Sequence, residues 1–161
     1  MTAALLRLLH VTVAVAFITG LIGRAVTFGQ ARSAASLETT AVLMKVSDWF
    51  DRRLVVPGSI LVLLSGIAMS WLGHWPLVTA AGRPTWLLAS LILLLLMVVL
   101  VPAVLIPERA RREAALADAL RTGRRTPELD DALRKRIVLR VRRLELVIVG
   151  AVLALMVLKP F

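Results

Sequence analysis

The chain has 161 residues, 59% of them hydrophobic, and its mean hydropathy of +0.86 argues against an ordinary soluble domain, which is about half apolar. Its net charge is +10, but the basic residues lie between very apolar segments, which favours contact with anionic lipid headgroups and no nucleic-acid partner. The absence of cysteine excludes disulfides, iron–sulfur clusters and thiolate metal sites.

Four segments are predicted to cross the membrane, because a span needs about 20 mostly apolar residues. The last uninterrupted apolar run begins only at Leu146, so its helix has to reach back through Glu145 to about Leu139. We therefore predict an all-α integral membrane four-helix bundle that forms one membrane domain over residues 1–161. The predicted spans are residues 5–28, 54–72, 86–107 and 139–158.

The distribution of Lys and Arg predicts the orientation of these spans. Sixteen of them lie in residues 29–53 and 108–143, whereas the opposite side has three, Arg7, Arg83 and Lys159. Positive residues are retained on the cytoplasmic side, so loops 29–53 and 108–138 are predicted to be cytoplasmic and both termini to be outside. The composition is typical of a bacterial protein, and we expect a multi-pass protein of the bacterial cytoplasmic (inner) membrane whose inner loops contact anionic inner-leaflet lipids.

The first inner loop is predicted to contain an amphipathic helix. Leu37, Ala41, Met44 and the Trp49–Phe50 pair follow roughly helical spacing. A helix with one apolar face can lie along a bilayer surface, so we expect this segment to lie against the inner leaflet.

The second inner loop is predicted to form a helical hairpin between spans three and four. Residues 108–120 have high helix propensity, and Thr122–Gly123 is expected to end that helix. Thr126 as N-cap and Pro127 as first helical residue then start a helix that leads into span four.

His10, Arg24 and Glu145 are the candidate functional residues inside the bilayer, where titratable groups are costly. His10 shares a helical stripe with Arg24, beside a surface of small residues suited to close helix contact, Ala16, Gly20 and Gly23. Its imidazole could ligate haem iron, bind a metal or carry protons, or it could simply hydrogen-bond a neighbouring helix.

His74 lies in the predicted outer loop, on the same side of the membrane as His10. The two histidines could share a metal or a haem, although two imidazoles alone are too few for a structural zinc site. The alternative is that His74, beside Trp75, is an ordinary residue of the membrane interface.

Arg24 and Glu145 are both placed towards the cytoplasmic ends of their spans. They could form a buried charge pair across spans one and four, or each could extend to the inner headgroups, with Arg142 or Arg143 neutralising Glu145. The sequence has no nucleotide-binding glycine loop, no catalytic triad and no paired carboxylates in the membrane, so no catalytic residue is assigned.

Three segments carry a resemblance to known families, and together they cover most of the chain. They are Leu9-His10-Val11 followed by residues 17–21 and Arg24, residues 52–57 with Gly66, and residues 158–161 preceded by Glu145. The chain resembles an uncharacterised family of small four-span bacterial integral membrane proteins. That family is distantly similar to membrane-bound protoporphyrinogen oxidases and to copper-resistance D-type proteins.

In the oxidase family the histidine of the first helix is associated with b-type haem and activity. The resemblance therefore implies that His10 is an axial ligand of haem b and that Arg24 meets a propionate. That family also carries a lysine near the start of its third helix and a histidine further along it, whereas residues 86–91 here are Trp-Leu-Leu-Ala-Ser-Leu and the next basic residue is Arg109.

We accordingly expect a non-catalytic packing, assembly or accessory protein, acting as a homo-oligomer or as a subunit of a membrane complex. The first alternative is a b-type haem-binding, redox-linked protein that uses His10, which as an enzyme would be a haem-dependent membrane oxidoreductase. The second alternative is transport of a small solute or an ion by an oligomer, since four spans alone are too few to enclose a pore.

Overall fold

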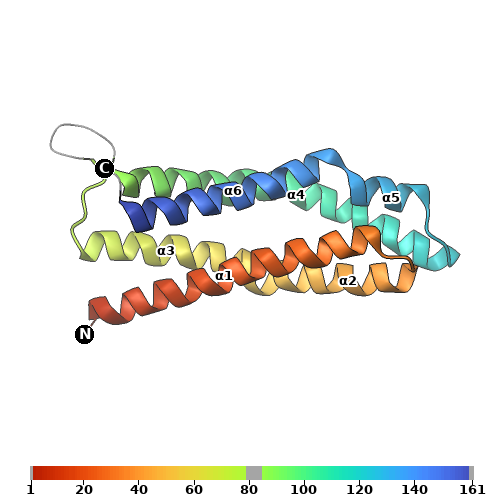
Figure 1. The fold of residues 1–161 in the computed structure, drawn as a ribbon, viewed down its shortest axis with the longest axis horizontal. Coiled ribbons are helices and arrows are strands. Elements are labelled where there is room, and N and C mark those ends of the chain that lie inside the picture. The colour runs from red at the N-terminus through yellow and green to blue at the C-terminus, as the bar shows by residue number, and fades with distance from the viewer. Residues whose placement is uncertain (1, 79–84, 160–161) are drawn as a thin grey trace.

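The computed structural model describes residues 2–78 and 85–159 and is built from helices (Figure 1). The predicted all-α class is therefore confirmed. A short π-helical turn, η1, separates two of the α-helices. The elements are α1 (Thr2–Ser33), α2 (Leu37–Phe50), η1 (Asp51–Val55), α3 (Val56–Leu72), α4 (Trp86–Thr122), α5 (Pro127–Arg134) and α6 (Arg136–Leu158).

Three helical stretches among the described residues are long and apolar enough to cross a membrane: Ala4–Ser33, Leu37–Leu72 and Trp86–Thr122. At 1.5 Å per residue, the 37 residues of α4 extend for about 55 Å, well beyond a hydrocarbon core of roughly 30 Å. Each of the three stretches is therefore long enough to cross a bilayer and to project beyond it. Helix α6 has 23 residues and is not among these three stretches; after its first residue it carries four charged side chains, Arg140, Arg142, Arg143 and Glu145.

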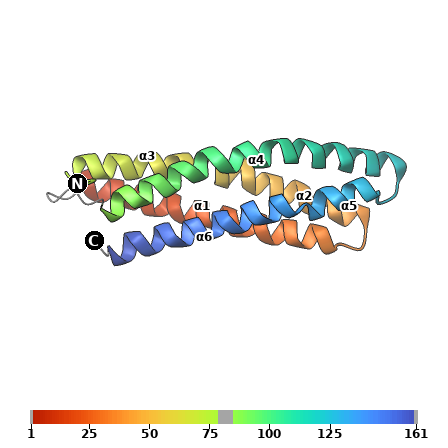
Figure 2. The ribbon, with the colours of Figure 1, turned by 90° about the horizontal axis from the view of Figure 1, so that it is seen from above.

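The long helices lie side by side in an elongated molecule, as the two perpendicular ribbon views show (Figures 1 and 2). Helix α1 packs against α2 and α3, while α4 packs against α6. The two chain ends lie at one end of the molecule, and α2 and α5 lie towards the other (Figure 1). We call the end that contains α2 and α5, residues 29–53 and 108–138, the head.

Helices α2 and α3 are joined by the π-helical turn, so Leu37–Leu72 is one continuous helical stretch. Ser36 caps its start by accepting a hydrogen bond from the backbone N–H of Thr39 at 3.1 Å. Pro57 has no N–H to donate to the carbonyl of Arg53, and a π-helical turn is one way in which a helix absorbs such a missing bond. The predicted helix over residues 37–50 is present, but it continues into α3 and packs along α1 rather than forming a separate segment.

The end of α4 has the sequence signals that were predicted to end and restart a helix. Gly123 follows α4 with a φ of +69°, a conformation that favours glycine, and Thr126 accepts a hydrogen bond from the backbone N–H of Leu129 at 3.3 Å. Both the break at Thr122–Gly123 and the restart at Pro127 are thus confirmed. A second break, which was not predicted, separates α5 from α6 at Lys135, whose ammonium donates a hydrogen bond to Glu108 on α4 at 2.9 Å.

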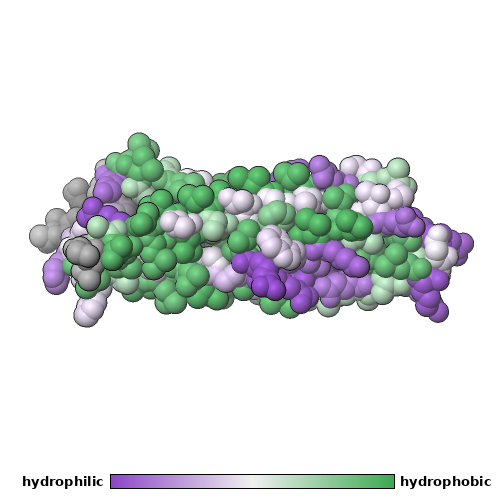
Figure 3. Space-filling view, turned by 90° about the horizontal axis from the view of Figure 1, so that it is seen from below, coloured by the Kyte–Doolittle hydropathy of each residue, from purple (hydrophilic) through white to green (hydrophobic). Residues whose placement is uncertain are grey.

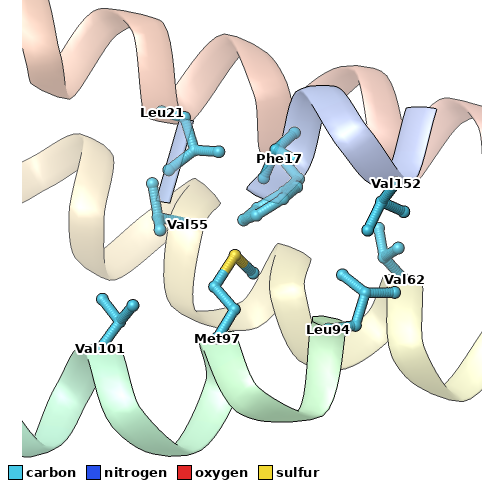
Figure 4. Packing of buried hydrophobic residues seen from close by; sticks show 9 residues of the cluster. Phe17, Leu21, Val55, Val62, Leu94, Met97, Val101 and Val152 are labelled. Carbon is cyan, nitrogen blue, oxygen red and sulfur yellow. The ribbon is translucent and has the colours of Figure 1, made fainter. Parts of the chain in front are cut away.

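Two hydrophobic clusters hold the helices together. The first lies near the middle of the molecule and unites side chains from α1, η1, α3, α4 and α6 (Figure 4): Phe17, Leu21, Val55, Val62, Leu94, Met97, Val101, Val149 and Val152. The second is in and beside the head: Phe28, Ala31, Met44, Ala119, Leu129, Leu133 and Val138. On the face in Figure 3, hydrophobic residues dominate the half with the chain ends, whereas hydrophilic residues gather over the half with the head.

Helix α1 approaches the α2–η1 region very closely at its small residues. A Cβ atom added to Gly20 would lie 2.6 Å from the Cβ of Leu54, and one added to Gly23 would lie 2.6 Å from the ring of Phe50. Both distances are shorter than van der Waals contact, so a larger residue at either position would force the neighbouring residue to shift. The prediction that Gly20 and Gly23 form a surface for close helix contact is confirmed.

Candidate functional site

Arg24 is the centre of a buried network of charged residues. Helix α1 places it on the same stripe as Phe17 and Leu21, and it is only 4% exposed. Its Nη1 donates a hydrogen bond to Oδ1 of Asp51 at 2.7 Å, and its Nη2 donates to Oε2 of Glu145. The structure therefore brings Arg24 and Glu145 together, which is one of the two arrangements that the sequence leaves open, and it adds Asp51 as a third member.

Arg109 of α4 extends this network towards the head. Its guanidinium lies 3.6 Å from Oδ2 of Asp51 and 3.3 Å from Oδ2 of Asp48, and its Nε donates a hydrogen bond to Glu113 at 2.9 Å. The ion pairs thus connect α1, α2, η1, α4 and α6. Acidic and basic groups alternate in the series Glu145–Arg24–Asp51–Arg109, so the buried Arg24 and Glu145 and the partly buried Asp51 and Arg109 all have a partner of opposite charge. This pairing offsets much of the cost of desolvation.

Two further arginines, Arg112 of α4 and Arg142 of α6, lie beside this network at the ring of Phe28. The Cζ atom of Arg142 is 3.9 Å from the centre of that ring and the Cζ of Arg112 is 5.1 Å from it, distances at which a cation is attracted to the face of an aromatic ring. Arg112 is 3% exposed. Both arginines line one cavity of about 350 Å³, together with Arg24, Asp51, Arg109 and Glu145 of the network.

Arg109 and Arg112 were not predicted as site residues, although the sequence of α4 carries a signal for them. The buried residues Leu94, Met97 and Val101 recur at helical spacing, and the same stripe continues through Leu105 to Arg109 and Arg112. A charged residue on the continuation of an apolar stripe points to the inside of the protein. Asp51 has no comparable signal, because its position depends on the π-helical turn.

His10 forms an interhelical hydrogen bond. Its Nδ1 lies 2.8 Å from Oγ of Ser65 on α3, and the Ser65 hydroxyl is 2.6 Å from the carbonyl oxygen of Leu61, to which it donates its proton. When Ser65 donates to Leu61, it accepts from the Nδ1–H of His10, and in that tautomer Nε2 carries a lone pair. This tautomer suits both readings of His10, because ligating histidines usually donate their other ring N–H to a neighbour.

The structure does not bring His10 and Arg24 together. They are separated by 14 residues of α1, which corresponds to about 21 Å along the helix axis. The guanidinium of Arg24 is also occupied by two carboxylates. Arg24 therefore does not fit as the partner of a propionate of a haem that His10 would hold.

His74 lies just beyond α3, with a φ of +50°, and lines a second cavity of about 360 Å³ together with Trp71 and Trp75. His10 contacts α3 at Ser65, which lies seven residues, or about 10 Å of helical rise, before α3 ends at Leu72. The two histidines therefore lie at different levels of the molecule. Within residues 2–78 and 85–159, no group of three or more His, Cys, Asp or Glu residues is arranged to hold a metal ion.

Comparison with known proteins places the chain in a family. Residues 4–160 match the family described as "Predicted integral membrane protein (DUF2269)". No curated protein and no solved structure matches the chain. Since the match covers nearly the whole sequence, the chain belongs to the DUF2269 family of predicted integral membrane proteins.

Proposed function

We propose that the chain is a non-catalytic four-helix protein of the bacterial cytoplasmic membrane that serves as a packing, assembly or accessory subunit. The observation that carries this proposal is the use of its buried charges. Arg24 pairs with Asp51 and Glu145, and Arg109 pairs with Asp48 and Asp51, so these groups connect helices to one another. Groups that satisfy each other in this way stabilise one arrangement of the helices.

The charge distribution supports the proposed placement in the membrane. The head carries exposed basic side chains, whereas the half with the chain ends is apolar on the face in Figure 3. Positive residues favour the cytoplasmic side, so the head is placed in the cytoplasm and both termini outside. The exposed basic residues of the head are Lys45, Arg52, Arg53, Arg111, Arg121, Arg124, Arg134 and Arg136.

Helix α6 is proposed as the fourth span in spite of its charges. It packs along α4, and Glu145 is only 2% exposed because it faces Arg24 inside the protein. A charge that is paired inside a bundle does not face lipid, which removes most of the cost of placing it at membrane depth. Arg140 and Arg143 are exposed, and they lie close enough to the head to reach the inner headgroups.

Several contacts hold the elements of the head together beneath its basic surface. Leu129 and Leu133 of α5 are buried in the second cluster, which fixes α5 against α1 and α4. Arg125 then bridges two loops, because it donates hydrogen bonds to the carbonyl of Ala34 at 2.8 Å and to that of Arg32 at 3.3 Å while it pairs with Asp130. A basic surface suits an acidic partner protein.

Site-specific photo-cross-linking in native membranes tests this role. A photoreactive residue at Arg121, which is 80% exposed on the head, is expected to yield protein adducts, whereas one at Val99, 58% exposed in the apolar part of α4, is expected to yield lipid adducts. Adducts at Arg121 that disappear when Arg124 is changed to Gln would show that the basic surface is the contact. Lipid adducts alone at both positions contradict a role in assembly.

A second candidate function, haem binding at His10, is favoured by the hydrogen bond between its Nδ1 and Ser65, because in the Nδ1–H tautomer Nε2 carries the lone pair that an iron ligand needs. It predicts an absorption spectrum with a Soret band at near-stoichiometric haem, lost in His10→Ala and retained in His74→Ala. A spectrum without these bands after haem supplementation contradicts it. The proposed non-catalytic role predicts that featureless spectrum.

A further inference from the structure

The cavity beside the arginine network has two unlike ends. One end is lined by charged groups from four elements, Arg24, Asp51, Arg109, Arg112, Arg142 and Glu145. The other is lined by apolar side chains of α3 and α4, which include Val56, Ile60, Val101, Leu105 and Ile106. Its shape and polarity therefore suit an amphiphile, with a charged group and a hydrophobic part.

The charged end has an excess of positive charge that the protein does not neutralise. In the described part of the chain, Arg112 and Arg142 take part in no ion pair, and Nε and Nη1 of both guanidiniums have no hydrogen-bond partner. Arg112 is nine-tenths or more buried, so water does not readily replace the missing partner. Both cations also lie at the same ring of Phe28, where they repel each other.

An anion bound between Arg112 and Arg142 would reduce the repulsion between these two unpaired cations. It would lie against both guanidiniums, which line the cavity, and bonds between ionised partners are among the stronger ones in proteins. Arginine matches the planar pairs of oxygens of phosphate and carboxylate groups particularly well. Asp51 and Glu145, the carboxylates that line the cavity, are already engaged with Arg24.

The apolar end of the cavity opens between α3 and α4. Val56, Ile60 and Ile106 line it and are exposed on the surface of the molecule. In the membrane placement proposed above, these side chains face the hydrocarbon core just inside the cytoplasmic headgroups. A hydrophobic chain can therefore enter the cavity sideways from the bilayer, while its head reaches the arginines.

We propose that this cavity is a binding site for an anionic membrane lipid, whose phosphate contacts Arg112 and Arg142 and whose acyl chain lies along Ile60, Val101 and Ile106. The inference rests on the proposed membrane placement but not on the proposed role in assembly. A free inorganic anion would make the same contacts with the guanidiniums, but it would leave the apolar end of the cavity empty.

The test is a titration of the delipidated, full-length protein in neutral detergent, followed by native mass spectrometry. The three probes are dioctanoyl phosphatidylglycerol, dioctanoyl phosphatidylcholine and inorganic phosphate. We expect phosphatidylglycerol to bind at one site and more tightly than either of the others. Equal binding of the two lipids would overturn recognition of an anion, and inorganic phosphate that binds as tightly as phosphatidylglycerol would overturn the lipid.

A pair of double variants tests the location of the site. Arg112→Gln with Arg142→Gln is expected to weaken binding of phosphatidylglycerol by about 10- to 100-fold. Arg111→Gln with Arg143→Gln removes the same charge from exposed neighbours and is expected to leave the affinity nearly unchanged. Equal losses in the two double variants would overturn the proposed site.

A second pair of variants avoids any change of charge. Val98 lines the cavity, whereas Val99 is exposed on the outside of α4. Val98→Trp is expected to fill the cavity and to abolish binding at the site, while Val99→Trp is expected to bind as the unmodified protein does. Unchanged binding in Val98→Trp would overturn the proposal. The lipid titrations of the protein and its variants involve no partner protein. Their results are therefore independent of the cross-linking at Arg121.

Discussion

Arg24 of α1 donates a hydrogen bond to Glu145 of α6, a residue 121 positions away in the chain. Both side chains are buried, and Asp51 of η1 accepts a second hydrogen bond from the same guanidinium. One arginine therefore joins the first helix to the last and to the π-helical turn. The charges that look costly in the sequence are, in the folded protein, contacts between helices.

Breaking this network from its centre is expected to destabilise the protein strongly. Arg24→Met leaves Glu145 buried without its partner, and the loss of one member of a buried pair typically costs about 3–5 kcal/mol. The double variant Arg24→Met with Glu145→Leu is expected to recover part of this loss, because no unpaired carboxylate of α6 remains. The free energy of unfolding in detergent micelles, measured by circular dichroism during denaturant titration, gives both values.

The control for this experiment is an exposed pair in the head. Arg121 and Asp118 lie 2.8 Å apart but are both exposed, so Arg121→Met is expected to change the free energy of unfolding by less than about 1 kcal/mol. Similar losses for Arg24→Met and Arg121→Met would show that burial of the network does not matter.

Gly20 and Gly29, both on α1, are expected to respond in opposite directions to the same substitution. Gly20→Ala places a Cβ 2.6 Å from that of Leu54 and 3.3 Å from the backbone nitrogen of Val55, atoms that cannot rotate away, and overpacking of this kind costs about 1–3 kcal/mol. Gly29→Ala meets no atom within 4 Å and removes a flexible residue from a helix, which stabilises by about 0.5–1 kcal/mol. Thermal unfolding in one detergent compares them, and a shift in the same direction for both contradicts the close approach of α1 and η1.

The hydrogen bonds of Arg125 are expected to control the rigidity of the head. Arg125→Gln removes the contacts to Ala34 and Arg32 that hold the α4–α5 loop against the α1–α2 loop. Hydrogen–deuterium exchange is therefore expected to increase in residues 32–40 and 122–131, with little change in α3. Arg124→Gln, at the exposed neighbouring position, serves as the control, and equal exchange in the two variants would contradict the bridging role.

Much of the fold could be predicted because it follows from local sequence. Apolar runs of the right length predicted the long helices, and Gly123, Thr126 and Pro127 predicted one helix boundary correctly because capping depends on a few adjacent residues. The continuity of α2 with α3 was not predicted. It depends on packing against α1, where Gly20 and Gly23 admit the partner helix at close range.

The candidate site was only partly accessible from the sequence. Arg24 and Glu145 could be singled out because a charge inside an apolar run is unusual, but the sequence could not decide between a mutual pair and separate contacts with headgroups. Asp51, Arg112 and Arg142 were missed as members of one site, since their proximity arises from the packing of three different elements. The arginine pair at Phe28 is a tertiary feature of this kind.

The proposed membrane placement, with four crossings and a cytoplasmic head, is tested most directly by cysteine accessibility. The chain has no native cysteine, so single substitutions His74→Cys, Arg124→Cys and Lys159→Cys can each be labelled with a membrane-impermeant maleimide in intact cells. We predict labelling at positions 74 and 159 without permeabilisation, and at position 124 only after it. Labelling at position 124 in intact cells, or none at position 159, would contradict the orientation and the crossing of α6.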